Sequence, residues 1–461
     1  MSALAKSAFK KNHNIDMTEG SVIKHIITFA FPLMIGNLFQ QLYNMVDIWV
    51  IGKTGLNGAY AAVGSVNPII NILIGFFLGL SSGTGVIISQ YYGAKNEKKA
   101  NEVVHTAIAM TLFMGVLFTV IGVIMAPVML KVMLKDSGSE VFGYAKTYLT
   151  IYFSGVMGVM LYNITAGILR AVGDSKRPFC FLLVSSLTNI VLDLVLVFVF
   201  DMDVDGVAIA TVVSQWFSAI LGVITLLRET NCVKLIIKKI QINKEHLKKI
   251  VILGIPAGIQ LSITAFSNVF VQSYVAGVNG DTTYCLAAYT SYAKVDNILF
   301  LPTQAIALAV TTLVGQNMGN KNEKRARQGT YKAIGLSLAV TLFFVVIIEF
   351  FSAPLAAIFN NDPNVVKYAS MLLVYISPFY LLTSINQIMA ASLRGMGNTK
   401  APMIILLGSL VGIRQLYLFI MAKISNELLP IAFSYPVGWF ICSVTFLIYF
   451  NLYKPKKNII D

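Results

Sequence analysis

Long apolar runs separated by short polar breaks follow one another along almost the whole chain. A helix needs about 20 mostly apolar residues to cross the hydrocarbon core of a bilayer. Twelve runs reach that length, and we predict transmembrane helices over residues 24–51, 59–89, 103–130, 143–169, 178–200, 206–228, 250–278, 284–315, 330–358, 366–393, 402–423 and 430–452. Several runs are longer than the bilayer requires, which predicts tilted or kinked helices, or helix ends that project into water. The pattern therefore indicates an all-α integral membrane protein.

The positive charges in the polar breaks predict the direction of each helix, because short cytoplasmic loops are rich in Lys and Arg. The termini and the loops on their side hold 26 basic residues, whereas the opposite loops hold five. The opposite side also carries an acidic group, Asp201, Asp203 and Asp205. We therefore expect a multi-pass protein with both termini in the cytoplasm.

Composition agrees with this and argues against other classes of protein. Of 461 residues, 56% are hydrophobic and 12% are charged, whereas soluble domains have about 25% charged residues. The net charge of +14 does not indicate nucleic-acid binding, because the basic residues fall in short loops and form no aromatic–basic stripe. The four Cys and four His are scattered without metal-ligand spacing. With no nucleotide-hydrolysis motif and no convergent set of nucleophiles, we expect no cofactor and no enzymatic activity.

Two motifs occur twice. The segment SQYYGAKNEKKA (89–100) returns as GQNMGNKNEKRA (315–326), and LRAVGDSKRP (169–178) returns as LRGMGNTKAP (393–402). The sequence spacing is nearly the same for both pairs, which indicates one internal duplication. Six runs per repeat return the chain to the same side, so we predict two parallel six-helix bundles related by a pseudo-twofold along the membrane normal. The predicted domains are residues 1–228 and 250–461, joined by a basic cytoplasmic linker over 229–249.

A few charged side chains fall inside the apolar runs, where each costs about 2.5–3.5 kcal/mol or more on insertion scales. In the first half, Asp47, Asp193 and Thr211 lie about 6, 10 and 8 Å below the outer ends of their helices, from the helical rise per residue. Asn189 lies one turn from Asp193 on the same helix face. If these four oxygen-bearing side chains converge, they form a site for a small hard cation or a proton-sharing carboxylate pair. The alternative is that they only make hydrogen bonds between helices.

Uncharged polar residues and prolines inside the apolar runs are further candidates for the site. The amides of Gln40, Asn44, Asn67 and Asn163 lie inside apolar runs and are candidates to line a substrate cavity, although each can equally serve ordinary helix packing. Pro32 and Pro256 occupy matching places in the two repeats and are predicted to kink the first and seventh helices. Lys294, Asp296 and Arg414 lie inside runs of the second half, and the sequence assigns them no role.

The segments FPLMIGNLFQQLYNMVDIWVIG (31–52) and LTNIVLDLVLVF (187–198), with the paired loops, resemble the multidrug and toxic compound extrusion (MATE) family, in particular its prokaryotic branch with an acidic cluster in the N-terminal half. The resemblance implies that Asp47, Asn189, Asp193 and Thr211 couple a cation to transport. It also implies that the first helix bends at Pro32, and that Gln40 and Asn163 line the substrate cavity. Family members export amphipathic, often cationic organic compounds in exchange for H⁺ or Na⁺.

The expected protein is therefore a cation-coupled multidrug antiporter of the bacterial plasma membrane. Its expected partners are small organic substrates, H⁺ or Na⁺ and the lipid bilayer, and we expect a monomer. A lipid or lipid-linked saccharide flippase of the same superfamily is the alternative, but it predicts a strongly basic central cavity, and the runs hold few cations. The duplication places Val271, Ile413, Tyr417 and Tyr435 where the first half has Asp47, Asn189, Asp193 and Thr211. We therefore expect coupling in the N-terminal half alone.

Overall fold

The computed structural model describes residues 14–53, 57–134, 139–278 and 282–455, and these residues form helices and no strands. In the first half the helices are α2 (Val22–Lys53), α3 (Asn57–Gly93), α4 (Glu97–Met133), α5 (Ser139–Ser154), α6 (Val156–Ala171), α7 (Lys176–Phe198) and α8 (Val204–Arg228). In the second half they are α9 (Lys244–Val275), α10 (Thr282–Gly319), α11 (Glu323–Ala357), α12 (Pro363–Ile376), α13 (Tyr380–Gly395), α14 (Lys400–Leu407), α15 (Arg414–Ile424), α16 (Leu428–Ala432) and α17 (Ser434–Leu452). The all-α prediction is confirmed.

The helices account for the predicted membrane spans. In the described part of the chain, eleven helical segments are long and apolar enough to cross a membrane, and the pair α5–α6 makes a twelfth if it counts as one span bent by 47°. The bend lies at Gly155, where a Cβ atom would meet Val212 Cγ1 of α8 at 2.3 Å. Only a glycine allows α8 to approach this closely at the bend. The sequence predicted the span and missed the break.

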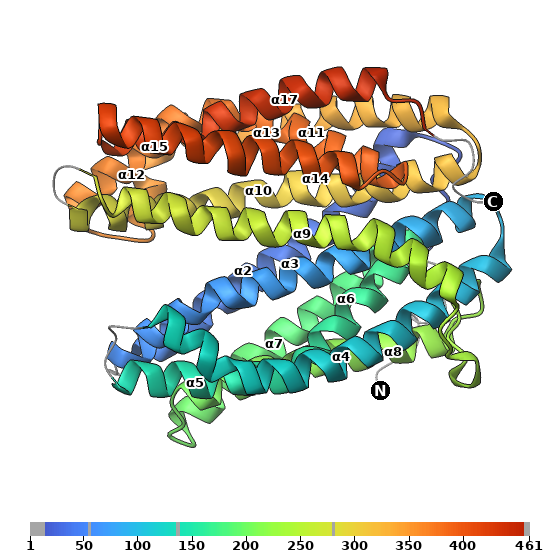
Figure 1. Ribbon diagram of the computed structural model, residues 1–461, viewed down its shortest axis with the longest axis horizontal. Coiled ribbons are helices and arrows are strands. Elements are labelled where there is room, and N and C mark those ends of the chain that lie inside the picture. Colours follow the sequence, from blue (N-terminus) through green and yellow to red (C-terminus); the bar gives the residue numbers. More distant parts are fainter. Residues whose placement is uncertain (1–13, 54–56, 135–138, 279–281, 456–461) are drawn as a thin grey trace. The chain divides into compact units, whose positions relative to one another are not determined.

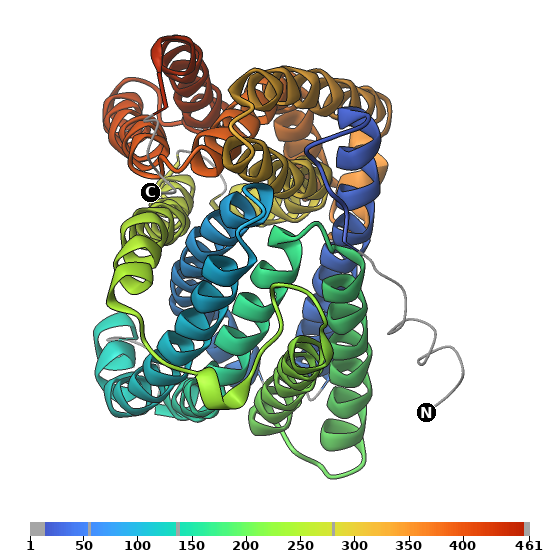
Figure 2. The same ribbon diagram turned by 90° about the vertical axis from the view of Figure 1, so that its right-hand side faces the viewer.

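The chain divides into two compact units that do not follow the order of the sequence. One unit comprises Ile35–Ile255 with the described residues before Met17, and the other comprises Met17–Met34 with Pro256 onward. Helices α2 and α9 are therefore each shared between the units, and each divides close to a proline, Pro32 or Pro256. Figures 1 and 2 show that the long helices within each unit run side by side as a bundle. The boundaries at residues 228 and 250 follow the sequence repeat and stay a prediction.

Each unit has its own apolar core and an apolar outer surface. Residues Val66, Leu130, Leu149 and Val156 belong to the core of the first unit, and Val271, Ile348, Leu372 and Ile431 belong to that of the second. Exposed apolar side chains recur every three or four residues on α4 (Phe113, Val116, Val120, Ile124) and on α11 (Phe343, Val346, Phe350). An exposed apolar stripe of this kind is typical of a helix that faces lipid.

The duplicated loops have the same backbone geometry in both halves. Lys95 and Lys321 adopt positive φ angles of 55° and 58°, and Gly173 and Gly397 adopt 88° and 83°. After each glycine, a backbone N–H reaches back five residues, from Asp174 to Leu169 and from Asn398 to Leu393. This is the Schellman arrangement that ends a helix. The repeat read from sequence is therefore also a repeat of local structure.

The segment before each shared helix is fastened to the unit that the helix enters first. Before α9, the Asn101 amide donates to the carbonyl oxygens of Cys232 (3.0 Å) and Lys234 (2.8 Å) in the first unit. Before α2, the backbone N–H of Met17 donates to Gln316 Oε1 at 2.9 Å in the second unit, and Arg325 binds the carbonyl oxygens of Glu19 and Gly20. The predicted linker is thus ordered against α4 where the structure describes it.

Candidate cation-binding site

Three helices of the first unit bring the predicted coupling residues together. Asp47 comes from α2, Asn189 and Asp193 come from α7, and Thr211 comes from α8. All four are buried, with exposed fractions of 8% for Asp47 and Thr211 and 0% for Asn189 and Asp193. Helices α7 and α8 pack against each other along much of their length. The arrangement agrees with the depths estimated from sequence, whereas the role of these residues stays a prediction.

The two carboxyl groups lie against each other. The side chain of Asp47 contacts both the Asp193 carboxyl and the Asn189 amide. The Thr211 hydroxyl donates to the carbonyl oxygen of Val207 in its own helix at 3.0 Å. Its lone pairs can still accept a hydrogen bond or bind a cation. Two carboxyls and one amide thus meet directly, and Tyr148 links Thr211 to them, because its hydroxyl contacts Thr211 and it lies near Asp47.

Most of these polar atoms lack a conventional partner. Asp47 Oδ1, both carboxyl oxygens of Asp193 and both polar atoms of the Asn189 amide are buried and make no hydrogen bond of normal geometry. Buried polar atoms in native proteins are nearly always satisfied, so a group of unsatisfied acceptors indicates a place for a proton or an ion. Carboxylate, amide and hydroxyl oxygens are the ligands that hard cations prefer. The arrangement can therefore hold a shared proton or a small cation.

Two tyrosines lie near Asp47, and sequence reasoning did not select them. Tyr148 of α5 places its hydroxyl against Thr211, and Tyr43 of α2 contacts Gln40 and Gln215. Tyr43 lies one turn before Asp47 on the same face of α2, which was a usable signal. Tyr148 gave no such signal, because its position depends on how α5 packs against α8.

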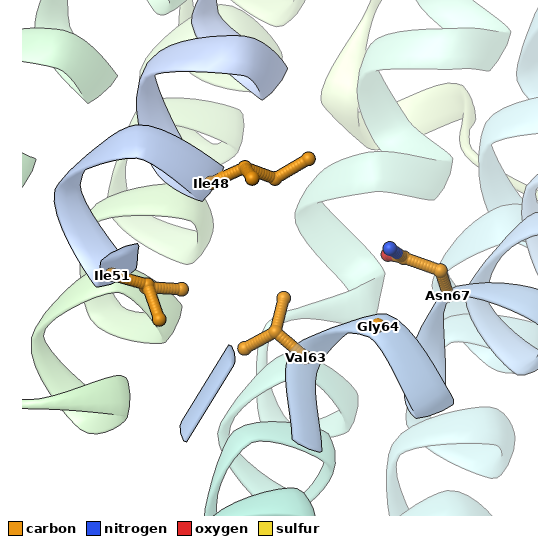
Figure 3. A pocket seen from close by; sticks show the side chains of 5 residues that line it. All are labelled: Ile48, Ile51, Val63, Gly64 and Asn67. Carbon is orange, nitrogen blue, oxygen red and sulfur yellow. The ribbon is translucent and has the colours of Figure 1, made fainter. Parts of the chain in front are cut away.

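A small pocket of about 80 Å³ lies between α2 and α3. It is lined by Ile48 and Ile51 of α2 and by Val63, Gly64 and Asn67 of α3. Figure 3 shows the Asn67 amide and the Ile48 side chain pointing toward each other into this space. The lining combines apolar surface with one amide, which suits an apolar group with one polar substituent.

The other predicted cavity residues do not line this pocket. Gln40 contacts Tyr43, and Asn44 is exposed. The Asn163 amide donates to the carbonyl oxygen of Val159 at 2.8 Å within its own helix, and its backbone carbonyl accepts from Ser81. The amide hydrogen bond lies within α6, and a role for Asn163 in a substrate cavity stays a prediction. Pro32 lies inside α2, which remains helical through it, three residues before the unit boundary.

A known protein family matches both halves of the chain. The MatE family model matches residues 32–195 and again residues 256–420. The chain belongs to the MatE family. The two matches fall one in each repeat, and the first includes Asp47, Asn189 and Asp193 but ends before Thr211.

Relatives within the MatE family are described as multidrug resistance proteins. The chain is 28% identical to the probable multidrug resistance protein YoeA of Bacillus subtilis, over 95% of this chain and 96% of the relative. It is 29% identical to the probable multidrug resistance protein NorM of Thermotoga maritima, over 87% and 86% of the two chains. A solved outward-facing MATE family transporter superposes with a TM-score of 0.89 at 23% identity, covering 96% of this chain and 98% of that one. The last likeness shows that the fold is that of a MATE transporter, and the family is one of membrane transporters.

Proposed function

We propose that the chain is an antiporter that exports amphipathic, often cationic organic compounds in exchange for H⁺ or Na⁺ at the plasma membrane. The observation that carries the proposal is the buried contact between Asp47 and Asp193, with Asn189 beside them, in which both oxygens of Asp193 and one oxygen of Asp47 make no hydrogen bond. Family membership and the multidrug resistance relatives support an organic substrate.

The electrostatics of the pair provide the coupling in this proposal. Two adjacent carboxylates in a low-dielectric site repel each other, so the pair is stable only with a proton or a cation between them. The site therefore exchanges its ion only when a change of conformation admits water. A conformational equilibrium that depends on ion occupancy is the requirement for exchange transport, and Pro32 lies where α2 can bend during that change.

The test uses the purified full-length chain in vesicles that contain a fluorescent organic cation. An H⁺ or an Na⁺ gradient is imposed separately, and efflux is followed for the wild type, Asp47→Asn and Asp193→Asn. We expect one of the gradients to drive wild-type efflux and each variant to lose that drive, because an amide neither holds the exchanged proton nor supplies the charge for a cation.

The matched control is Asp201→Asn, which makes the same substitution at an exposed carboxylate of the same unit. Asp201 has a φ of 53°, a conformation that asparagine also adopts readily. We expect this variant to transport like the wild type. Gradient-driven efflux at the wild-type rate in Asp47→Asn contradicts the proposal.

A further inference from the structure

A buried arginine occupies, in the second unit, a place close to the one that the acids occupy in the first. Arg414 begins α15 and is 2% exposed. The duplication aligns Ile413 with Asn189 and Tyr417 with Asp193, so Arg414 lies one position from the counterpart of Asn189. The two repeats therefore carry opposite charges on corresponding helices.

The guanidinium of Arg414 has neutral partners. Its Nη2 donates to Ser267 Oγ at 2.6 Å and to Asn268 Oδ1 at 3.1 Å, both on α9. The group also lies 5.0 Å from the centre of the Tyr435 ring, a distance typical of a cation–π contact. Its Nε is buried and has no hydrogen-bond partner. None of the ion pairs among the described residues includes Arg414.

The local backbone is built around this side chain. The six residues before it, Gly408–Ile413, form a π-helical turn. Such turns are rare in proteins overall, and those that occur are often at functional sites. In this turn the carbonyl oxygen of Leu410 accepts from Ser267 Oγ at 3.4 Å, and Gln415 Nε2 also donates to Ser267 Oγ at 3.1 Å. Ser267 is thereby fixed between Leu410, Gln415 and the guanidinium. The arginine is held in place by a supporting network.

A cation buried within apolar helices is stabilised by an anion. None of the carboxylates among the described residues forms an ion pair with Arg414. Arginine presents N–H donors in a planar fork that matches the two oxygens of a carboxylate. Asn268, which covers one side of the guanidinium, is exposed, so only one side chain separates Arg414 from the surface of its unit. The site is therefore close enough to that surface for a ligand to reach it.

We propose that Arg414, with Ser267 and Asn268, is a subsite that binds the carboxylate of amphipathic organic substrates. The inference rests on the proposed export function and names the residues that would recognise one part of its substrates. Chloride carries the same charge as a carboxylate and could bind Arg414 in its place. The experiment below distinguishes binding of a substrate carboxylate from binding of chloride.

The experiment measures equilibrium binding to the purified full-length chain by fluorescence polarisation. The probes are rhodamine B, which has a free carboxylate, and its ethyl ester, which lacks that charge. In a chloride-free gluconate buffer we expect the wild type to bind the acid about tenfold or more tightly than the ester, the scale of a charge-assisted hydrogen bond. Equal binding of the two probes by the wild type overturns the proposal without any variant.

The variants assign the preference to one side chain. In Arg414→Gln we expect acid binding to weaken to the level of the ester while ester binding is unchanged, and in Arg414→Lys we expect an intermediate preference. The control is Lys423→Gln, which removes an exposed cation from the same helix. A preference for the acid that survives Arg414→Gln, or equal loss of both probes in Arg414→Lys, overturns the proposal.

The last measurement tests whether chloride competes with rhodamine B for the same site. Competition of chloride with rhodamine B in the wild type, absent in Arg414→Gln, supports a shared anion site. A chloride effect on thermal stability that requires Arg414, without discrimination between acid and ester, identifies an inorganic anion site and overturns the carboxylate proposal. Gradient-driven efflux of the ester is measured in parallel. Its absence counts against the proposed function alone, because binding discrimination does not depend on ion coupling.

Discussion

At the residue scale, the Thr211 hydroxyl has one proton and two lone pairs to place. The proton is used within α8, where the hydroxyl donates to the carbonyl oxygen of Val207, and Tyr148, which contacts the hydroxyl, also lies near Asp47. An oxygen in this state can bind a metal cation but adds little to a proton that two carboxyls already share. If the proposed site is correct, Thr211 would therefore distinguish H⁺ from Na⁺ coupling better than either aspartate does.

We expect Thr211→Val to raise the Na⁺ concentration for half-maximal efflux about tenfold or more, on the scale of a lost interaction with a charged group. Thr211→Ser, which keeps the hydroxyl, is expected to stay near the wild type. The measurement is efflux from vesicles at fixed pH with Na⁺ varied. Identical Na⁺ dependence in the Val and Ser variants contradicts a role for the hydroxyl as a cation ligand.

Cys232 provides a second prediction at this scale, outside the membrane. Burial raises the pKa of its thiol to about 12. A higher pKa means less of the reactive thiolate at any given pH, so at pH 8 the thiolate fraction falls from roughly a quarter, for an ordinary thiol, to about one in ten thousand. We expect the native protein to react very slowly with N-ethylmaleimide at this position, in a chain whose other three cysteines are replaced by serine.

Asn101→Ala tests the cause, because the Asn101 amide fastens the Cys232 segment to α4. We expect this variant to react at least about tenfold faster, as the segment detaches and the thiol regains water. Mass spectrometry over a time course gives the rates. A rate unaffected by Asn101→Ala shows that other contacts bury the thiol.

At the element scale, the backbones of α3 and the beginning of α9 approach each other closely inside the first unit. A Cβ atom at Gly83 would lie 2.5 Å from the backbone nitrogen of Gly254. The Gly254 nitrogen belongs to the backbone and cannot rotate away, so an added methyl group would force one of the two helices to move. Overpacking of this kind typically costs about 1–3 kcal/mol.

We therefore expect Gly83→Ala to lower the melting temperature of the detergent-solubilised protein by several degrees. Gly335→Ala in α11 is the matched control, since no atom lies within 4 Å of the Cβ position there. There we expect no loss, or a small gain from the better helix propensity of alanine. Equal melting temperatures for Gly83→Ala and the wild type contradict the packing argument.

The same scale shows where sequence reasoning succeeds and where it stops. The length and apolarity of each run identify a membrane helix, because lipid imposes both along the chain itself. The break at Gly155 and the π-helical turn before Arg414 follow instead from contacts with α8 and α9, which no local pattern encodes. The candidate site divides in the same way. Asp193 and Asn189 share a helix face and are predictable, whereas Tyr148 comes from another helix.

At the scale of the whole molecule, the two repeats share loops and differ in the charges inside their helices. The paired turns keep one geometry, as the φ angles of Gly173 and Gly397 show. The first unit gathers acids at α2 and α7, and the second places Arg414 on the helix that corresponds to α7. Duplication explains the common frame, and the interior positions then diverged.

The orientation of the molecule is a prediction at this scale, based on the 26 basic residues on one side against five on the other. In a cysteine-free chain, we expect a membrane-impermeant maleimide to label Lys53→Cys in intact cells and Lys98→Cys only after permeabilisation. Both positions are exposed, so accessibility within the protein does not limit the reaction. The reverse labelling pattern places the termini outside.

The sharing of α2 between the two units has a consequence for biosynthesis. Met17 binds Gln316, which is made 299 residues later. During synthesis the segment before the first helix therefore lacks this native neighbour until α9 and α10 of the second half have been made. Completion of the fold is a late event, and we expect a nascent chain that stops after α8 to be recognised by quality control as unfinished.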